Sequence, residues 1–456
     1  MKKKTLYIVI ELKVREFIAK LLFSYFASLR GYRIYLGSRE QIFNIIEEKK
    51  TKAGLFFYKA GLQLDKTIQI SKKVNTHITL DEEMTAGLNT ERYYTGAKAF
   101  FKGAKKYIDG YFYINNKIAK IVKKQIKVKN VYSAGWPRVD LYKKEFSNIY
   151  KEDVTKIKKN FGDYYLFMSD IGFISKDYAG YALEYLPFGG TKKDGKNWHK
   201  YSLNKAQNAF EEFSYIINFF KNICKKNKNI KILVRAHPSE NFKAWRNAFK
   251  DTKNLILLTP NDDPQPWIMA SKGVLHRGCS TSFQAFALNK PIAYLKLNPN
   301  FNNKFIKRRP YEISYKIFNE SDFFKWIKIK KKNNFSLIKK ELNFDNKKHS
   351  CNKILDIVDD MKIDKENIHY LIDKKTSIKD IFNFYFLKLK NYVYIFLVIS
   401  KILKRNKDRI YFTPKIPNGI KKKEAIKFMK KIKRKKTENI NISQISKDLL
   451  KIEKFQ

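Results

Sequence analysis

Short apolar runs alternate with helical patterns along the first 150 residues. The runs TLYIVI (5–10) and RIYLG (33–37) are rich in β-branched and aromatic residues, which is typical of buried strands. Between them, apolar residues recur at helical spacing over 14–30, and Gly31 then provides a helix stop. Further strands are expected at 54–58, 75–80, 110–114 and 130–135. Strands that alternate with helices predict a parallel sheet with helices on both faces.

The same alternation starts again after a Lys-rich bridge at 143–160. A long amphipathic helix is expected over 208–225. Strands are expected at 163–170, 231–238, 255–260, 273–276 and 291–295. The chain therefore reads as an α/β protein with two Rossmann-like domains, 1–150 and 151–340, followed by a helical, basic C-terminal extension over 341–456. Two such domains that face each other across a cleft are a recurring arrangement in nucleotide-dependent enzymes, because ligands bind at the carboxyl ends of parallel strands.

The charge of the chain is strongly positive. The 456 residues hold 95 Lys and Arg against 43 Asp and Glu, a formal net charge of +52. An apolar content of 44% excludes a disordered polyelectrolyte. Nucleic acid, an anionic membrane surface and anionic substrates are the partners that such charge attracts. No nucleic-acid-binding module is visible and the charge is not confined to one motif, so nucleic acid is not an expected partner.

The positive charge is densest near the C-terminal end of the sequence. Residues 401–456 hold 19 Lys or Arg and 5 Asp or Glu. Such a segment can lie on an anionic bilayer, and the aromatic stretch 378–403 before it either joins that surface or packs back on the cleft. No uncharged apolar run is long enough to span a membrane, and the three cysteines have no disulfide spacing. We therefore expect a cytoplasmic protein, with a peripheral position at the inner face of the cytoplasmic membrane as an alternative.

Three carboxylates, Asp81, Glu82 and Glu83, follow the expected strand 75–80 in the run LDEEMTAG. Adjacent carboxylates raise one another's pKa, so one of them could act as a general base or acid, or attack an anomeric carbon. The alternative is an acidic cap for the helix that begins near Thr90.

A second candidate site is the run VRAHPSE at the end of an apolar strand. Arg235 and His237 end the strand, and Pro238 suits the first position of the following helix. A guanidinium, an imidazole and free backbone N–H groups make an anion site. The alternative is a histidine that only bonds a backbone carbonyl.

A third candidate is HRGCSTSFQ, where Gly278 permits a tight turn before a helix. The hydroxyls of Ser280, Thr281 and Ser282, with the N–H groups at the helix start, could grip a phosphate. Simple N-capping is the alternative, and both can hold.

Two further positions are ambiguous. Arg138 and Asp140 in SAGWPRVDLY either pair with each other or line a hinge. Glu11 either faces acceptor hydroxyls or pairs with Lys13 or Arg15. The six histidines are scattered without metal-ligand spacing, so no metal is expected. No GxxxxGK(S/T) or GxGxxG loop occurs, and we expect no cofactor.

Taken in order, YIVIELKVRE, DEE, AGWPRVDLY, VRAHPSE and STSFQAFALNKP resemble the bacterial surface carbohydrate biosynthesis proteins, which are relatives of GT-B-type glycosyltransferases, over about residues 5–300. The order is also similar to bacterial sialyltransferases and β-Kdo transferases, which use CMP-activated sugars. The resemblance implies that one carboxylate of 81–83 is catalytic and that Glu240 contacts the nucleotide. It implies that the CMP phosphate meets His237, Pro238, Ser280, Thr281 and Ser282. Met84 replaces a usual Gly and Gln284 a usual Glu, which leaves the acidic motif's geometry and the nucleotide open.

The resemblance thus implies a metal-independent glycosyltransferase of capsule or lipopolysaccharide biosynthesis. Its donor substrate is a nucleotide sugar, CMP-linked by the resemblance, and its acceptor a glycan or a lipid-linked glycan. A sugar-nucleotide 2-epimerase and a CDP-polyol phosphotransferase are alternatives with the same architecture.

Overall fold

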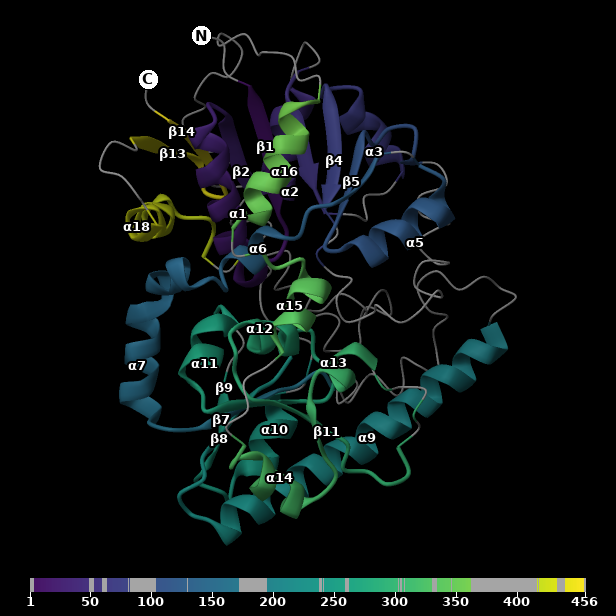
Figure 1. Ribbon diagram of the computed structural model, residues 1–456, viewed down its shortest axis with the longest axis vertical. Coiled ribbons are helices and arrows are strands. Elements are labelled where there is room, and N and C mark those ends of the chain that lie inside the picture. Colours follow the sequence, from purple (N-terminus) through teal and green to yellow (C-terminus); the bar gives the residue numbers. More distant parts are fainter. Residues whose placement is uncertain are drawn as a thin grey trace, which may run out of the picture.

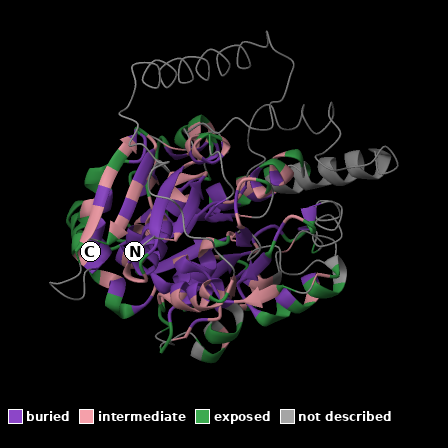
Figure 2. Cartoon of the chain, turned by 90° about the horizontal axis from the view of Figure 1, so that it is seen from above, coloured by how far each residue is buried: buried purple, intermediate pink, exposed green. Residues whose placement is uncertain are grey.

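Two largely parallel sheets, one above the other in Figure 1, organise the computed structural model. The structure describes residues 4–48, 53–59, 64–80, 82, 104–128, 130–171, 195–237, 240, 242–258, 262–301, 303, 306, 308–329, 334–345, 347–361, 416, 418–432 and 439–454. Buried residues run through the centre of the molecule, and exposed residues lie on the outer helices (Figure 2).

The first sheet is parallel from β2 to β6, in the order β2-β1-β3-β4-β5-β6. Its strands are β1 (Thr5–Ile10), β2 (Arg33–Ser38), β3 (Leu55–Tyr58), β4 (Thr76–Leu80), β5 (Gly110–Tyr113) and β6 (Val131–Ser133). The helices of this domain are α1 (Lys13–Leu29), α2 (Arg39–Glu47), α3 (Leu64–Ser71), α5 (Asn116–Ile126) and α6 (Pro137–Asp140).

Helices cover both faces of this first sheet. Side chains alternate along a strand, so Leu6 and Ile8 of β1 join the apolar cluster of α1, whereas Tyr7 and Val9 join the cluster of α2. Because both faces are buried, every position of β1 is apolar or small, as the run TLYIVI indicated.

The second sheet has the order β12-β11-β10-β7-β8-β9 and is parallel throughout. Its strands are β7 (Tyr165–Met168), β8 (Ile232–Arg235), β9 (Leu255–Leu258), β10 (Gly273–His276), β11 (Ile292–Leu295) and β12 (Tyr315–Ile317). Its helices are α9 (Gly195–Lys226), α10 (Phe242–Phe249), α11 (Pro264–Ala270), α12 (Thr281–Ala287), α13 (Arg308–Glu312) and α14 (Glu320–Trp326). A 3-10 helix, η1 (Lys144–Tyr150), and α7 (Lys151–Phe161) connect the two sheets, so the expected boundary at residue 150 falls between these two linking elements.

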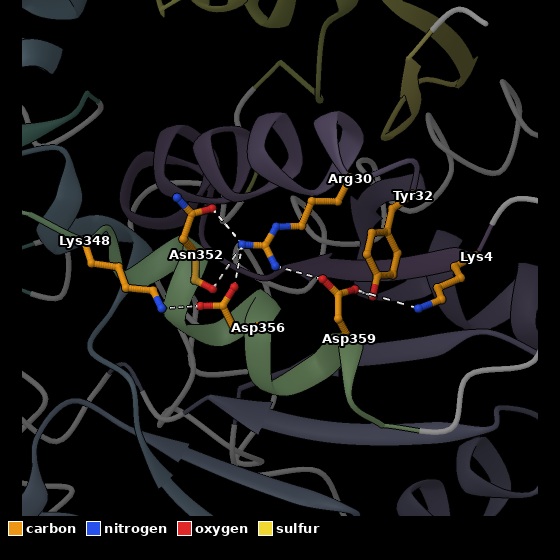
Figure 3. Close-up of polar contacts among 7 residues, drawn as sticks. All are labelled: Lys4, Arg30, Tyr32, Lys348, Asn352, Asp356 and Asp359. Carbon is orange, nitrogen blue, oxygen red and sulfur yellow. Dashed lines mark hydrogen bonds and ion pairs between the residues drawn. The ribbon is translucent and has the colours of Figure 1, made fainter.

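After the second sheet the chain returns to the first domain. Helix α15 (Phe335–Leu342) lies at the junction, and α16 (Ser350–Asp359) packs on α1 and α6. Figure 3 shows the polar contacts that hold α16: the Arg30 guanidinium donates to Asp356 and Asp359 at 2.8 Å each, and the Tyr32 hydroxyl donates to Asp359 at 2.6 Å.

The expected helical C-terminal extension is wrong for residues 439–454. Helix α18 (Lys422–Ile432) is followed by β13 (Ile440–Ser446) and β14 (Leu449–Lys454), an antiparallel hairpin. Strand β14 pairs antiparallel with β2, so the hairpin belongs to the first domain's sheet. The dense lysines hid a strand pattern in which Leu450 and Ile452 alternate with polar residues. Residues 362–415, with the aromatic stretch 378–403, lie outside the described residues.

Among the residues that the structure describes, no helix is long and apolar enough to cross a membrane.

Candidate functional site

A cavity of about 190 Å³ lies between the two domains, at the carboxyl ends of both sheets. The first domain lines it with the start of α1, the residue Glu82 after β4, and α6. The second domain lines it with the ends of β7 and β8 and the starts of α11 and α12. Parallel sheets place ligand sites at this edge, because the loops that follow the strands converge there.

Basic side chains from separate elements line this cavity and are called the cationic wall below. Arg15 lies in the first turn of α1, Arg138 in α6, and Arg235 and His237 at and after the end of β8. The positive end of the 17-residue α1 dipole points to the same place. Guanidinium groups that converge in a partly buried cavity bind phosphate well, because they donate paired hydrogen bonds to its oxygens.

Arg235 is part of this wall, but it is also held from behind. Its Nη1 donates to Asp262 Oδ1 at 2.5 Å, and its Nη2 donates to the Asp262 backbone carbonyl. Trp267 Nε1 donates to the other carboxylate oxygen of Asp262 at 2.7 Å. From the sequence we expected Arg235 to contact the donor. The structure shows in addition that Asp262 fixes the orientation of the Arg235 guanidinium. His237 is exposed at the cavity, and Pro238 lies outside the described residues.

Glu240 does not face the cavity, although the resemblance implied a contact with the nucleotide. Its side chain is fully buried, and it accepts hydrogen bonds from Ser169 Oγ at 2.8 Å and Trp245 Nε1 at 2.9 Å. Burial raises the pKa of Glu240 to about 7, against the hydrogen bonds from Ser169 and Trp245, and the nearby Asp170 adds to the rise. Ser169 itself lines the cavity, so Glu240 supports the wall from below.

The turn before α12 brings two of the three expected hydroxyls to the cavity. Ser280 and Thr281 line it, and the Ser280 side chain makes no capping hydrogen bond to α12. Ser282 is buried, does not line the cavity, and its Oγ finds no hydrogen-bond partner within the described part of the chain. The Ser280 hydroxyl is therefore not a simple cap of α12. Ser282 lies away from the cavity lining, so the geometry does not support a phosphate contact by its hydroxyl.

Gly278 and His276 shape this turn. Gly278 has φ +120°, a conformation that favours glycine, and its N–H donates to His276 Nδ1 at 3.0 Å. The other ring nitrogen of His276 lies 2.8 Å from Ser314 Oγ. Gly278 thus allows the backbone to make the turn before α12, but it does not line the cavity.

The carboxylate side of the site is Glu82. It lines the cavity on the first-domain side, across from the β8 end, whereas Asp81 and Glu83 lie outside the described residues. Tyr142 lies close to it: burial raises the pKa of Tyr142, and the charges of Asp263 and Glu82 raise it further. One of the three expected acids therefore reaches the cationic cavity.

Arg138 and Asp140 do not pair with each other. Arg138 lines the cavity, but Asp140 is buried on the other side of α6, where it accepts from the backbone N–H groups of Ser350 and Cys351 at 2.9 Å each. The Lys143 ammonium lies 3.3 Å from the same carboxylate. Asp140 is therefore the N-terminal cap of α16, supplied from a distant part of the sequence.

Glu11 pairs with neither Lys13 nor Arg15. The Lys59 ammonium lies 2.6 Å from its carboxylate, and the Tyr58 hydroxyl donates to it. Burial raises the pKa of Glu11, but these two contacts outweigh burial and lower it. Lys13 instead pairs with Glu424 of α18 at 2.5 Å.

The sequence reasoning missed three groups at the site: Arg15, Tyr142 and the Asp262–Asp263 pair. Tyr142 lines the cavity together with Gln284 of α12. A signal for the aspartate pair was present, because the pair follows β9 at the same edge of the sheet where β8 ends with Arg235. Among the described residues, no group of three His, Cys, Asp or Glu side chains could hold a metal ion.

No protein-family model and no curated protein sequence matches the chain. A solved UDP-GlcNAc 2-epimerase from Methanocaldococcus jannaschii is similar, with a TM-score of 0.51 and 14% identity over 78% of this chain and 99% of that chain. A UDP-GlcNAc 2-epimerase from Neisseria meningitidis bound to UDP-GlcNAc has a TM-score of 0.44 and 13% identity, over 79% of this chain and 99% of that one. The wall teichoic acid polymerase TagF has a TM-score of 0.42 and 13% identity, over 78% and 83%. The first likeness confirms the expected fold class, two Rossmann-like domains of GT-B type.

Proposed function

We propose that the chain is a glycosyltransferase of bacterial surface-polysaccharide biosynthesis that uses a nucleotide-activated sugar. The observation that carries this proposal is that basic side chains of both domains and one carboxylate line the same interdomain cavity. Arg138 and Arg235 supply the cations, His237 supplies an imidazole, Ser280 and Thr281 supply hydroxyls, and Glu82 supplies the carboxylate. A phosphate on one side and an acceptor hydroxyl on the other side fit these groups.

In the proposed reaction, the acceptor oxygen bonds to the anomeric carbon while the bond from that carbon to the phosphate oxygen breaks. The leaving nucleotide keeps the electron pair, and its charge is stabilised by Arg138, His237 and the Ser280 hydroxyl. In this direct displacement Glu82 takes the proton from the acceptor hydroxyl, which gives inversion. In the two-step alternative Glu82 displaces the nucleotide to form a glycosyl-enzyme bond, and the acceptor oxygen then displaces Glu82, whose freed carboxylate takes the acceptor proton, which gives retention. No metal is needed in this scheme, since cationic side chains offset the charge of the leaving group.

The resemblance makes CMP the first nucleotide to test, with CDP and UDP beside it. Turnover with sugars linked to each nucleotide should fall by about two orders of magnitude or more in Glu82→Gln and His237→Ala, the range typical of a general base and of an oxyanion donor. Glu47→Gln is the control, since Glu47 only pairs with Lys66 on the surface of the first domain, at 2.9 Å. Full turnover in both site variants would refute the proposal.

A sugar-nucleotide 2-epimerase is the second candidate, because the solved structure with a TM-score of 0.51 carries that name. Product analysis separates the two reactions. A transferase releases the free nucleotide and extends the acceptor, whereas an epimerase converts the donor alone and needs no acceptor.

We also place the acceptor, a glycan or a lipid-linked glycan, next to an anionic membrane surface bound through 401–456. The support is the exposed lysine row of α18: Lys422, Lys423, Lys427 and Lys430. Flotation with anionic and with neutral liposomes tests this, and equal recovery with both kinds would refute it.

A further inference from the structure

Two adjacent carboxylates, Asp262 and Asp263, lie directly behind the cationic wall of the cavity. They follow β9 and precede α11, at the same edge of the second sheet as the end of β8. Neither lines the interdomain cavity, but Pro264, the next residue, does. The two residues instead line a second groove of about 820 Å³, between α1, α7, α11 and α18.

Asp262 holds the Arg235 guanidinium at two points. Its Oδ1 accepts from Arg235 Nη1 at 2.5 Å, and its backbone carbonyl accepts from Nη2. The remaining oxygen, Oδ2, accepts from Trp267 Nε1 at 2.7 Å, so the carboxylate cannot rotate freely. The Arg235 side chain is 6% exposed and that of Asp262 is 52% exposed, so the aspartate reaches the guanidinium from the solvent side.

Asp263 sits in the field of two cavity arginines. Burial raises its pKa, and the charges of Arg138 and Arg235 oppose that rise. The carboxylate is also fixed, because it accepts from the Gln265 backbone N–H at 2.9 Å and from the Tyr150 hydroxyl at 3.1 Å. It thereby joins the linker η1 to the start of α11.

We propose that Asp262 is a positioning residue that aims Arg235 at the phosphate of the donor. This inference rests on the proposed function. A long arginine side chain loses rotamer freedom when it binds an anion, and a carboxylate that fixes it beforehand removes that loss. The same carboxylate also competes with the bound phosphate for the guanidinium. Fixing the side chain strengthens phosphate binding, whereas competition weakens it, so the change in affinity on replacing Asp262 decides which effect is larger.

The experiment is isothermal titration of inorganic pyrophosphate and of CMP into the wild type and into Asp262→Asn. If Asp262 positions Arg235, the variant should bind pyrophosphate about tenfold more weakly, the size typical when a residue that orients a binding group is replaced. Asp163→Asn is the matched control, because Asp163 pairs with Lys272 at 2.9 Å on the surface of the same domain. Its affinity for pyrophosphate should equal that of the wild type.

A double-mutant cycle shows whether Asp262 acts through Arg235. The effects of Asp262→Asn and Arg235→Lys should not add, because the aspartate loses its role once the forked guanidinium is gone. Trp267→Phe keeps the ring and every charge but removes one anchor of Asp262, so it should weaken binding in the same direction by a smaller factor. This variant keeps the test valid if Asp262→Asn folds poorly.

Equal or tighter pyrophosphate binding by Asp262→Asn would overturn the inference, as would additive effects in the cycle or no binding by the wild type. The proposed function fails separately, if the wild type binds pyrophosphate but no sugar nucleotide supports turnover.

Discussion

Replacing Glu240 with Gln should remove a pH dependence of stability from the second domain. Glu240 is fully buried and accepts hydrogen bonds from Ser169 and Trp245. Glutamine has the same shape and fits the same contacts. Its carbonyl oxygen can accept from Trp245, and its amide can donate to the Ser169 hydroxyl, which both donates and accepts.

The magnitude follows from the position of the Glu240 pKa. Burial is the largest cause that raises it, and it stands at about 7 in the folded chain, against 4.5 for an exposed glutamate. Between these values the unfolded chain has released the proton and the folded chain has kept it. Stability therefore falls as the pH rises through this window, and the loss is complete above pH 7. One pKa unit corresponds to about 1.4 kcal/mol, so the loss is about 3 kcal/mol.

The assay is urea unfolding followed by tryptophan fluorescence, at pH 5, 6, 7 and 8. The free energy of unfolding of Glu240→Gln, relative to the wild type, should increase by about 2.5 kcal/mol between pH 5 and pH 8, because the rest of the loss already occurs below pH 5. Asp251→Asn, at an exposed turn after α10, is the control for loss of one negative charge and should follow the wild type. If Glu240→Gln and the wild type kept a constant difference at all four pH values, the reasoning would be refuted.

Three further changes test other parts of the fold by chemical denaturation. Asp140→Ala removes the cap of α16 and takes a carboxylate partner from the buried Lys143, which keeps its hydrogen bond to the Lys348 carbonyl, so it should lower the free energy of unfolding by about 2 kcal/mol. Lys20→Met removes the ammonium that lies 2.5 Å from the buried Glu16 carboxylate and lowers its pKa to about 2. The free energy of unfolding should therefore fall by about 3–5 kcal/mol at pH 7. That loss should shrink at low pH, because a protonated Glu16 needs no partner; a loss independent of pH would contradict the ion-pair account. Gly135→Ala adds a Cβ that would lie 2.4 Å from Ser350 Oγ at φ +77°, whereas Gly162→Ala, at φ +65°, meets nothing within 4 Å. The first should therefore destabilise more than the second, by about 1–3 kcal/mol, and equal losses would show that α16 yields to the new methyl group.

The sequence predicts the two parallel sheets well because their signal is local. A strand buried on both faces is a short continuous apolar run, and a run such as ILVR of β8 can be recognised from its own residues. The same reasoning places candidates at strand ends, and Glu82, Arg235, His237 and Ser280 do meet at one cavity.

What the sequence did not predict depends on contacts between distant positions. Asp140 caps a helix whose first residue lies 210 positions later. Glu11 pairs with Lys59, which follows β3, and not with the nearby Lys13 or Arg15. Glu240 is polar and follows a strand, which suggests a cavity contact, but its carboxylate turns into the core to meet Trp245. Spacing along the chain carries no information on the direction of such side chains.

The hairpin on the edge of the first sheet has a consequence for synthesis on the ribosome. Arg33 of β2 bonds to Glu453 of β14 across 420 positions of sequence. At about 5–20 residues per second, the edge of β2 waits roughly 20–80 s for its partner, long enough for the second domain to emerge in between. Until then β2 presents unpaired backbone groups that invite pairing with another nascent chain. A product cut short before residue 439 would keep that edge permanently, so premature termination should yield chains that aggregate or are degraded.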